Sequence, residues 1–232
     1  MKLISTVLLA AAFASGAWAQ TGPYAPPQNV LQLSASGSVE VQQDLLGLSL
    51  TTTRDGADAS GVQSQLKAAL EAALSEAKKS AQPGQLDVRT GNFGLYPRYT
   101  PAGKISGWNG TAELVLEGRD FSRITQTAAR ITTLTLGSVS FGLSREQRLK
   151  VETDAQQLAI DQFKLKAGEL AKGFGFSGYT LREIAVNAND GGNYPRPRMA
   201  MQAKAGAAEA AVPVEPGKTS VTVTVSGTVQ LK

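Results

Sequence analysis

The chain has 232 residues, 42% of them hydrophobic, and a formal net charge of +4 at pH 7, and it contains no cysteine and no histidine. These two absences exclude disulfides, thiol redox chemistry, Cys/His zinc sites, the Ser-His-Asp triad and Cys-His nucleophiles. The charge is mild and no run of five or more Lys and Arg residues occurs, so we expect no nucleic-acid partner.

Residues 1–19 have the features of a cleaved export signal. Lys2 supplies the positive start, an apolar run covers 3–14, and Ala17-Trp18-Ala19 is a small-x-small cleavage site. The apolar run is shorter than the roughly 20 residues that cross a bilayer, so no integral membrane segment is expected. The pattern predicts cleavage between Ala19 and Gln20 and a periplasmic or secreted protein.

After an extended lead-in over 20–29, the first half of the mature chain, about 30–117, has four strand patterns and one helix pattern. Apolar residues at every second position predict half-buried strands, and apolar residues at helical spacing behind Asp58 predict a helix with that residue as its N-cap. Gly91 and Gly94 predict a bulge in the third strand. The expected elements are strands at 30–41, 44–53, 86–99 and 105–117, and a helix at 58–80.

The second half, about 121–232, resembles the first in the order of its elements. Ser144-Arg-Glu-Gln147 fits a capping box at the start of a long helix, and Gly173 fits the left-handed residue after its end. Residues 188–217 lose all periodicity and are rich in Ala, Gly and Pro, which predicts a mobile loop. The expected elements are helices at 121–134 and 145–172, and strands at 137–144, 179–187 and 218–231.

Each half contains the order strand–helix–strand–strand. This order predicts an α+β fold of two βαββ-like units, with a mainly antiparallel sheet and helices packed on one face. Residues 173–178 match G-x-G-x-x-G, but they follow a helix and lead into a strand, which is the wrong context for a dinucleotide site. No catalytic, cofactor-binding or metal-binding residue is therefore predicted.

Two weaker signals remain. The tripeptide Tyr-Pro-Arg occurs twice, and exposed Tyr and Arg are favoured in contact surfaces. The simpler explanation is structural, with proline interrupting an edge strand and stiffening a loop. Two methionines in the predicted loop are candidate oxidation-sensitive residues, or ordinary apolar residues of that loop. The candidate contact residues are Tyr96, Arg98, Tyr194, Arg196 and Arg198, and the two methionines are Met199 and Met201.

Several segments in their order and spacing resemble the SIMPL-domain family of bacterial periplasmic proteins. The matching segments are 33–40 (Leu-Ser-Ala-Ser-Gly-Ser-Val-Glu), 105–108 (Ile-Ser-Gly-Trp), 138–144 (Ser-Val-Ser-Phe-Gly-Leu-Ser) and 213–217 (Pro-Val-Glu-Pro-Gly) before the last strand. The resemblance covers residues 30–232. It implies a periplasmic, self-associating protein linked to the cell envelope or to oxidative-stress defence, and it carries over no active-site residue.

Two classes of function follow. The first is a non-enzymatic protein that assembles with itself, and possible partners are further copies of this chain or another envelope protein. Strands 30–41 and 219–231 carry this hypothesis: they either pair with each other inside one protomer or offer an edge to a second chain. The alternative is a periplasmic hydrolase or lyase that uses carboxylate or Tyr/Arg residues, which requires an Asp/Glu pair converging in a pocket.

Overall fold

The computed structural model describes residues 28–189 and 213–232, and in these ranges the chain forms seven strands and three helices. The strands form two antiparallel sheets, which confirms the predicted α+β class. The elements are β1 (Val30–Gln42), β2 (Leu45–Gly56), α1 (Ala59–Lys78), β3 (Asp87–Tyr99), β4 (Ile105–Gly118), α2 (Phe121–Arg130), β5 (Thr135–Gly142), α3 (Arg145–Gly173), β6 (Tyr179–Asn189) and β7 (Lys218–Leu231).

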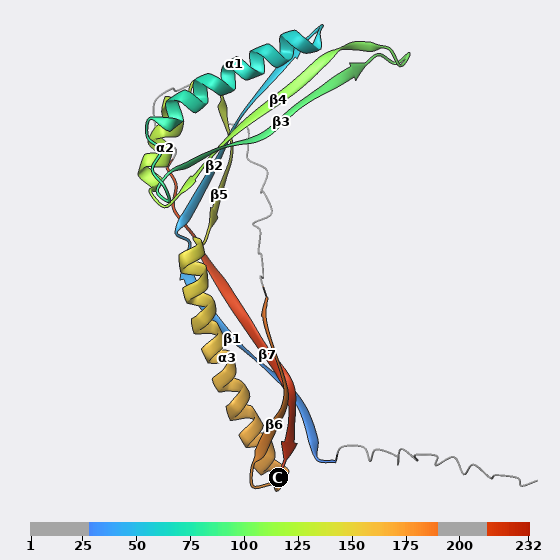
Figure 1. Ribbon diagram of the computed structural model, residues 1–232, viewed down its shortest axis with the longest axis vertical. Helices are drawn as coiled ribbons and strands as arrows, with labels where there is room; N and C mark the ends of the chain where they lie inside the picture. The colour runs from blue at the N-terminus through green and yellow to red at the C-terminus, as the bar shows by residue number, and fades with distance from the viewer. Residues whose placement is uncertain (1–27, 190–212) are drawn as a thin grey trace, which may run out of the picture.

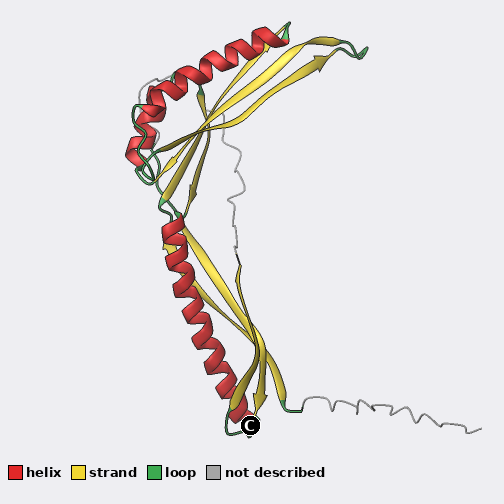
Figure 2. Ribbon diagram, in the orientation of Figure 1, coloured by secondary structure: helices red, strands yellow, loops and turns green. Residues whose placement is uncertain are grey.

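The first sheet has the order β3-β4-β2-β5 and carries α1 and α2 on one face, and we call this unit the α1–α2 lobe. The alternation in β2 explains the arrangement, because Leu46, Leu48 and Leu50 all point to the helices and are buried, with Ser and Thr on the other face. Figure 2 shows both helices on the same side of this sheet. The opposite face is mostly polar.

The second sheet has the order β1-β7-β6, and α3 packs along it as the α3 lobe. Small residues let the helix lie close to the strands: a Cβ atom added to Gly37 of β1 would stand 2.2 Å from the backbone oxygen of Ala155. The buried face of α3 carries alanine at four of its six positions, with Val151 and Phe163 at the others. The helix therefore covers β1 and β7 closely and leaves much of β6 exposed.

Strand pairing crosses between the two halves of the sequence. β1 belongs to the first half but pairs with β7 along its whole length, from Val30 opposite Gln230 to Gln42 opposite Lys218. β5 belongs to the second half but pairs with β2 in the other lobe. The helices still lie on one face of each sheet, as predicted. However, each lobe contains one strand from the other half of the sequence: β5 in the α1–α2 lobe and β1 in the α3 lobe.

In the described residues the chain runs between the lobes from β1 to β2, from β5 to α3 and in the segment before β7, and hydrogen bonds join these segments (Figure 1). The Asp44 carboxylate accepts bonds from both the backbone N–H (2.6 Å) and the hydroxyl (2.5 Å) of Ser144. The backbone N–H of Gln43 donates to the Gly217 carbonyl at 3.0 Å. The lobes are thus held together by a polar junction, and the arc in Figure 1 bends there.

Local details confirm some predictions and correct others. Asp58 caps α1 and Ser144 caps α3 through its hydroxyl, as expected, and the β3–β4 register shifts at Gly91, which confirms the bulge there, whereas Gly94 pairs regularly. The left-handed residue after α3 is Gly175 (φ 83°) instead of Gly173, because α3 runs one residue further than expected.

Some segment boundaries also differ, most of all those of α2 and β6. α2 ends at Arg130, four residues before the predicted end, because β-branched Ile131 adopts an extended conformation there. β6 continues to Asn189, and thus into the segment predicted as a loop. The part of that segment at 190–212 lies outside the described residues.

Candidate functional site

The predicted contact residues of the first Tyr-Pro-Arg tripeptide lie on β3, on the face of the sheet away from the helices. Tyr96 is 56% exposed, and Arg98 forms an ion pair with Asp55 of β2 at 3.6 Å. Tyr194, Arg196, Arg198, Met199 and Met201, like the cleavage residues Ala19 and Gln20, lie outside the described residues. The structure therefore brings Tyr96 and Arg98 together and leaves the second tripeptide untested.

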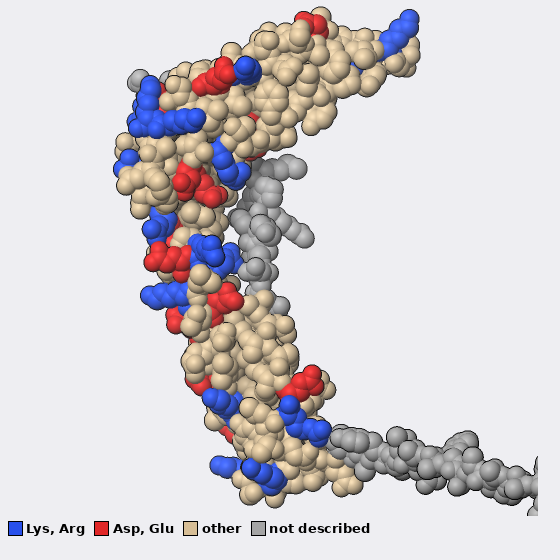
Figure 3. All heavy atoms as spheres, in the orientation of Figure 1, with Lys and Arg blue, Asp and Glu red and all other residues tan. Residues whose placement is uncertain are grey.

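The hairpin of β3 and β4 that carries Tyr96 projects beyond the start of α1 (Figure 1). Near its tip Tyr99 and Ile105 are also largely exposed. On the face drawn in Figure 3, this hairpin is almost free of charged groups except at its tip, whereas Lys and Arg gather where the end of α1 meets α2. On this face the hairpin thus carries few charged groups, and most of the charge lies near α2.

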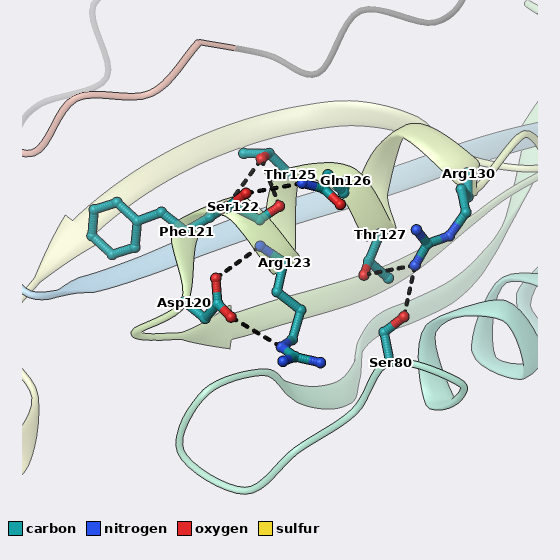
Figure 4. A network of polar contacts seen from close by, with 9 residues as sticks. All are labelled: Ser80, Asp120, Phe121, Ser122, Arg123, Thr125, Gln126, Thr127 and Arg130. Carbon is teal, nitrogen blue, oxygen red and sulfur yellow. Dashed lines mark hydrogen bonds and ion pairs between the residues drawn. The ribbon is translucent and has the colours of Figure 1, made fainter.

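The charged region surrounds a polar groove of about 410 Å³ between the end of α1 and α2, which we call the α1–α2 groove. Figure 4 shows its residues, most of which come from one side of α2. The lining residues are Ser80, Asp120, Ser122, Arg123, Gln126, Thr127 and Arg130.

Two arginines in this groove are held in place by carboxylates. The Nε of Arg123 donates to Asp120 at 3.1 Å, and the Nε of Arg130 donates to Glu76 of α1, also at 3.1 Å. Arg130 further donates from Nη2 to the hydroxyls of Ser80 (2.6 Å) and Thr127 (3.2 Å). Arg130 thereby fixes the end of α2 against the end of α1 (Figure 4).

Both carboxylates remain ionised near neutral pH. The Arg123 backbone N–H, which Asp120 accepts as the N-cap of α2, lowers the pKa of the Asp120 carboxyl below its usual value, and the Arg123 guanidinium adds to this. The pKa of Glu76 is lowered mainly by its hydrogen bond from Lys79, and also by Arg130. These acids serve to orient the arginines.

Two further hollows are less polar. An apolar crevice of about 160 Å³ lies between α2 and the strands, with Leu136 of β5 at its edge. A groove of about 450 Å³ lies between β1 and α3, where Lys166 donates to the Ser34 carbonyl at 3.0 Å. Each of the three hollows described here contains at most one carboxylate.

Within the described residues, four strands have a neighbour on one side only: β1, β6, β3 and β5. β5 contains no charged residue, and Leu136 and Val139 on it are 40% and 39% exposed because α2 stops before it covers them. β1 contains one charged residue, Glu40, which pairs with Lys218 at 2.8 Å. β7, by contrast, is the central strand of its sheet, so its buried valines offer no edge.

The described residues contain no group of three or more acidic residues that could hold a metal ion, and no helix among them is long and apolar enough to cross a membrane. The sequence reasoning missed the α1–α2 groove. Its signal was nevertheless present, since Arg123, Gln126 and Arg130 recur at helical spacing opposite the apolar face of the predicted helix.

A comparison with family models matches residues 31–229 to "SIMPL: Protein of unknown function (DUF541)". No curated protein matches the chain. Among solved structures, "The crystal structure of AtUAH in complex with glyoxylate" and "The crystal structure of AtUAH in complex with (S)-hydroxyglycine" each match at 13% identity and a TM-score of 0.24. The matches cover 56% and 57% of this chain and 34% of each of those chains, so the chain spans about a third of their length. A similarity this low carries no argument.

Proposed function

This chain belongs to the SIMPL family, and we propose that it is a non-enzymatic periplasmic protein that assembles with itself through exposed sheet edges. We include in the proposal a link to the cell envelope or to oxidative-stress defence, which rests on the family resemblance and the export signal. Another envelope protein is the second candidate partner.

The observation that carries the proposal is the unpaired, uncharged edge of β5. Its backbone has a strand neighbour on one side only within the described residues, and its eight residues include no charge and no proline. Native sheets protect such edges with charges, proline or a cover, because unpaired N–H and C=O groups are a template for another strand. β3, in contrast, carries Arg89, Arg98 and Pro97. β5 is therefore better suited than β3 to accept a second copy.

The non-enzymatic part of the proposal rests on the composition and on the hollows. The whole chain lacks histidine and cysteine. The carboxylates near the α1–α2 groove are engaged with arginines, and no described hollow contains an acidic pair. The hydrolase or lyase alternative would need such a pair to act as general acid and base.

The test measures the chain as cells export it. Intact mass spectrometry of the osmotic-shock fraction is expected to find a protein that begins at Gln20, and light scattering is expected to give a mass above that of the monomer that falls on dilution. Ser138→Lys, which adds one charge to exposed β5, should shift the equilibrium toward monomer. Gln65→Lys adds the same charge on the exposed face of α1 and should change nothing.

Two results would contradict the proposal. A chain that keeps residues 1–19 after export would exclude the soluble periplasmic form. A single monomer mass at tens of micromolar, independent of salt, would exclude self-assembly.

A further inference from the structure

The α1–α2 groove has more hydrogen-bond donors than free acceptors. The Ser80 hydroxyl accepts a bond from Arg130, and the Ser122 hydroxyl accepts one from Gln126 at 2.9 Å. An arginine can only donate, so the Ser80 oxygen is necessarily the acceptor and its own proton remains available. The same holds for Ser122 opposite the amide Nε2 of Gln126.

The guanidinium groups add further donors. Arg123 uses Nε for Asp120, and its two Nη atoms form no hydrogen bond within the described residues. Arg130 donates from Nε and Nη2, and its Nη1 also forms no hydrogen bond within the described residues. The carboxylate that lines the groove is already engaged: one oxygen of Asp120 accepts the backbone N–H of Arg123 at 2.9 Å, and the other accepts its guanidinium.

Fixed guanidinium groups beside free hydroxyl donors are complementary to a ligand that only accepts. We propose that the α1–α2 groove binds a phosphate group, held by Arg123 and Arg130 and by the hydroxyls of Ser80 and Ser122. A phosphate has more acceptor oxygens than a carboxylate; the two Nη atoms of Arg123 are placed to bind two of them at once, and Arg130 contributes Nη1. The arginine side chains are partly exposed, so inorganic phosphate and the phosphate of a lipid headgroup both have access.

The arrangement costs little reorganisation on binding. Each guanidinium is oriented by a carboxylate through Nε, so the Nη donors are already positioned before a ligand arrives. Replacing Arg123 by lysine keeps the positive charge but removes the two Nη donors, so it should still weaken phosphate binding.

The experiment titrates the mature chain with inorganic phosphate by calorimetry, and in parallel measures co-sedimentation with vesicles of phosphatidylcholine alone or mixed with phosphatidylglycerol. Arg123→Gln and Arg130→Gln should each weaken binding roughly tenfold or more. Arg123→Lys should restore part of the loss and Ser122→Ala should give a smaller one. Arg98→Gln is the matched control, since Arg98 is also paired with one aspartate but lies outside the groove.

Each outcome is decisive. Saturable binding of free phosphate that depends on Arg123 supports the site with a small-molecule source. Binding only to phosphatidylglycerol vesicles, with the same dependence, supports a headgroup source. Arg130 also joins α1 to α2, so Arg130→Gln could prevent folding. In that case the result for Arg123→Gln alone tests the proposal. Absence of binding in both arms, or an equal loss in Arg98→Gln, overturns the proposal.

Discussion

Gly37 is the residue on which the close packing of the α3 lobe depends. An added Cβ would stand 2.2 Å from the Ala155 backbone oxygen and 2.5 Å from the Ala159 backbone nitrogen. Both neighbours are helix backbone, so the contact cannot be relieved by rotating a side chain. We expect Gly37→Ala to lower the free energy of unfolding by about 2 kcal/mol or more, measured by urea denaturation.

Gly168 provides the matched control for that substitution. It lies in α3, the helix that Gly37 of β1 contacts, and an added Cβ would meet no atom within 4 Å. Gly168→Ala should therefore raise the free energy of unfolding by roughly 0.5–1 kcal/mol, because alanine is the better helix former. Equal effects of the two substitutions would show that the close approach of α3 to β1 does not exist in solution.

Glu113, on the face of the first sheet away from the helices, makes the stability of the protein depend on pH. Its carboxylate accepts the backbone N–H of Asn92 at 2.9 Å and the Ser49 hydroxyl, and these bonds, that from Asn92 first, lower its pKa below the ordinary value of 4.5. A lowered folded-state pKa stabilises the protein above the unfolded value and loses that contribution as the pH falls through the folded value.

Glu113→Gln should therefore destabilise the protein near neutral pH, and this difference from the natural chain should shrink as the pH falls below 4.5. Urea denaturation at a series of pH values measures it. Glu117→Gln, on the same strand and face, shows the effect of removing one charge. A difference that is constant with pH would mean that the two hydrogen bonds to Glu113 do not form.

At the scale of elements, the periodicity of the sequence predicted every helix and strand of the described chain, with ends that differ by up to about four residues. This succeeded because β2, α1 and β7 each bury one face, and the buried face leaves its period in the sequence. The caps at Asp58 and Ser144 were also readable, since capping is a local interaction.

The pairing of the strands was much harder to predict from the sequence. The alternation in β5 is the same whether it pairs with β2 or with β6, so local pattern did not reveal that β5 joins the other lobe. The β1–β7 pairing was one of two alternatives that the sequence left open. The role of Asp44 could not be predicted either, because its partner Ser144 is a hundred positions away in the chain.

The α1–α2 groove shows the same limit at the candidate site. Helical spacing places its residues on one side of α2, but their contacts with Glu76 and Ser80 depend on how α2 meets the end of α1. Tyr96 and Arg98 could be placed together because residues two apart on a strand share a face. The ion pair of Arg98 with Asp55 required the register of three strands.

At the scale of the whole molecule, the described residues form two lobes with separate buried cores. Leu46, Leu114 and Ile124 belong to the core of the α1–α2 lobe, whereas Phe163 and Val225 belong to the core of the α3 lobe, and no buried residue is shared. Within the described residues the lobes meet through the hydrogen bonds of the junction near Asp44 and the ion pair of Arg119 with Glu146, and their buried clusters do not merge. Separate cores joined by a few polar contacts favour independent unfolding.

Trp108 makes this testable, because it is the only tryptophan after Gln20 and it packs in the α1–α2 lobe. In Gly37→Ala, whose added methyl group disturbs the α3 lobe, the urea midpoint from Trp108 fluorescence should stay at the value of the natural chain. Hydrogen exchange measured by mass spectrometry should become faster in peptides of α3 and β7 and remain unchanged in those of α1. If instead the Trp108 midpoint falls together with the protection of α3, the junction transmits stability between the lobes and the molecule unfolds as one unit.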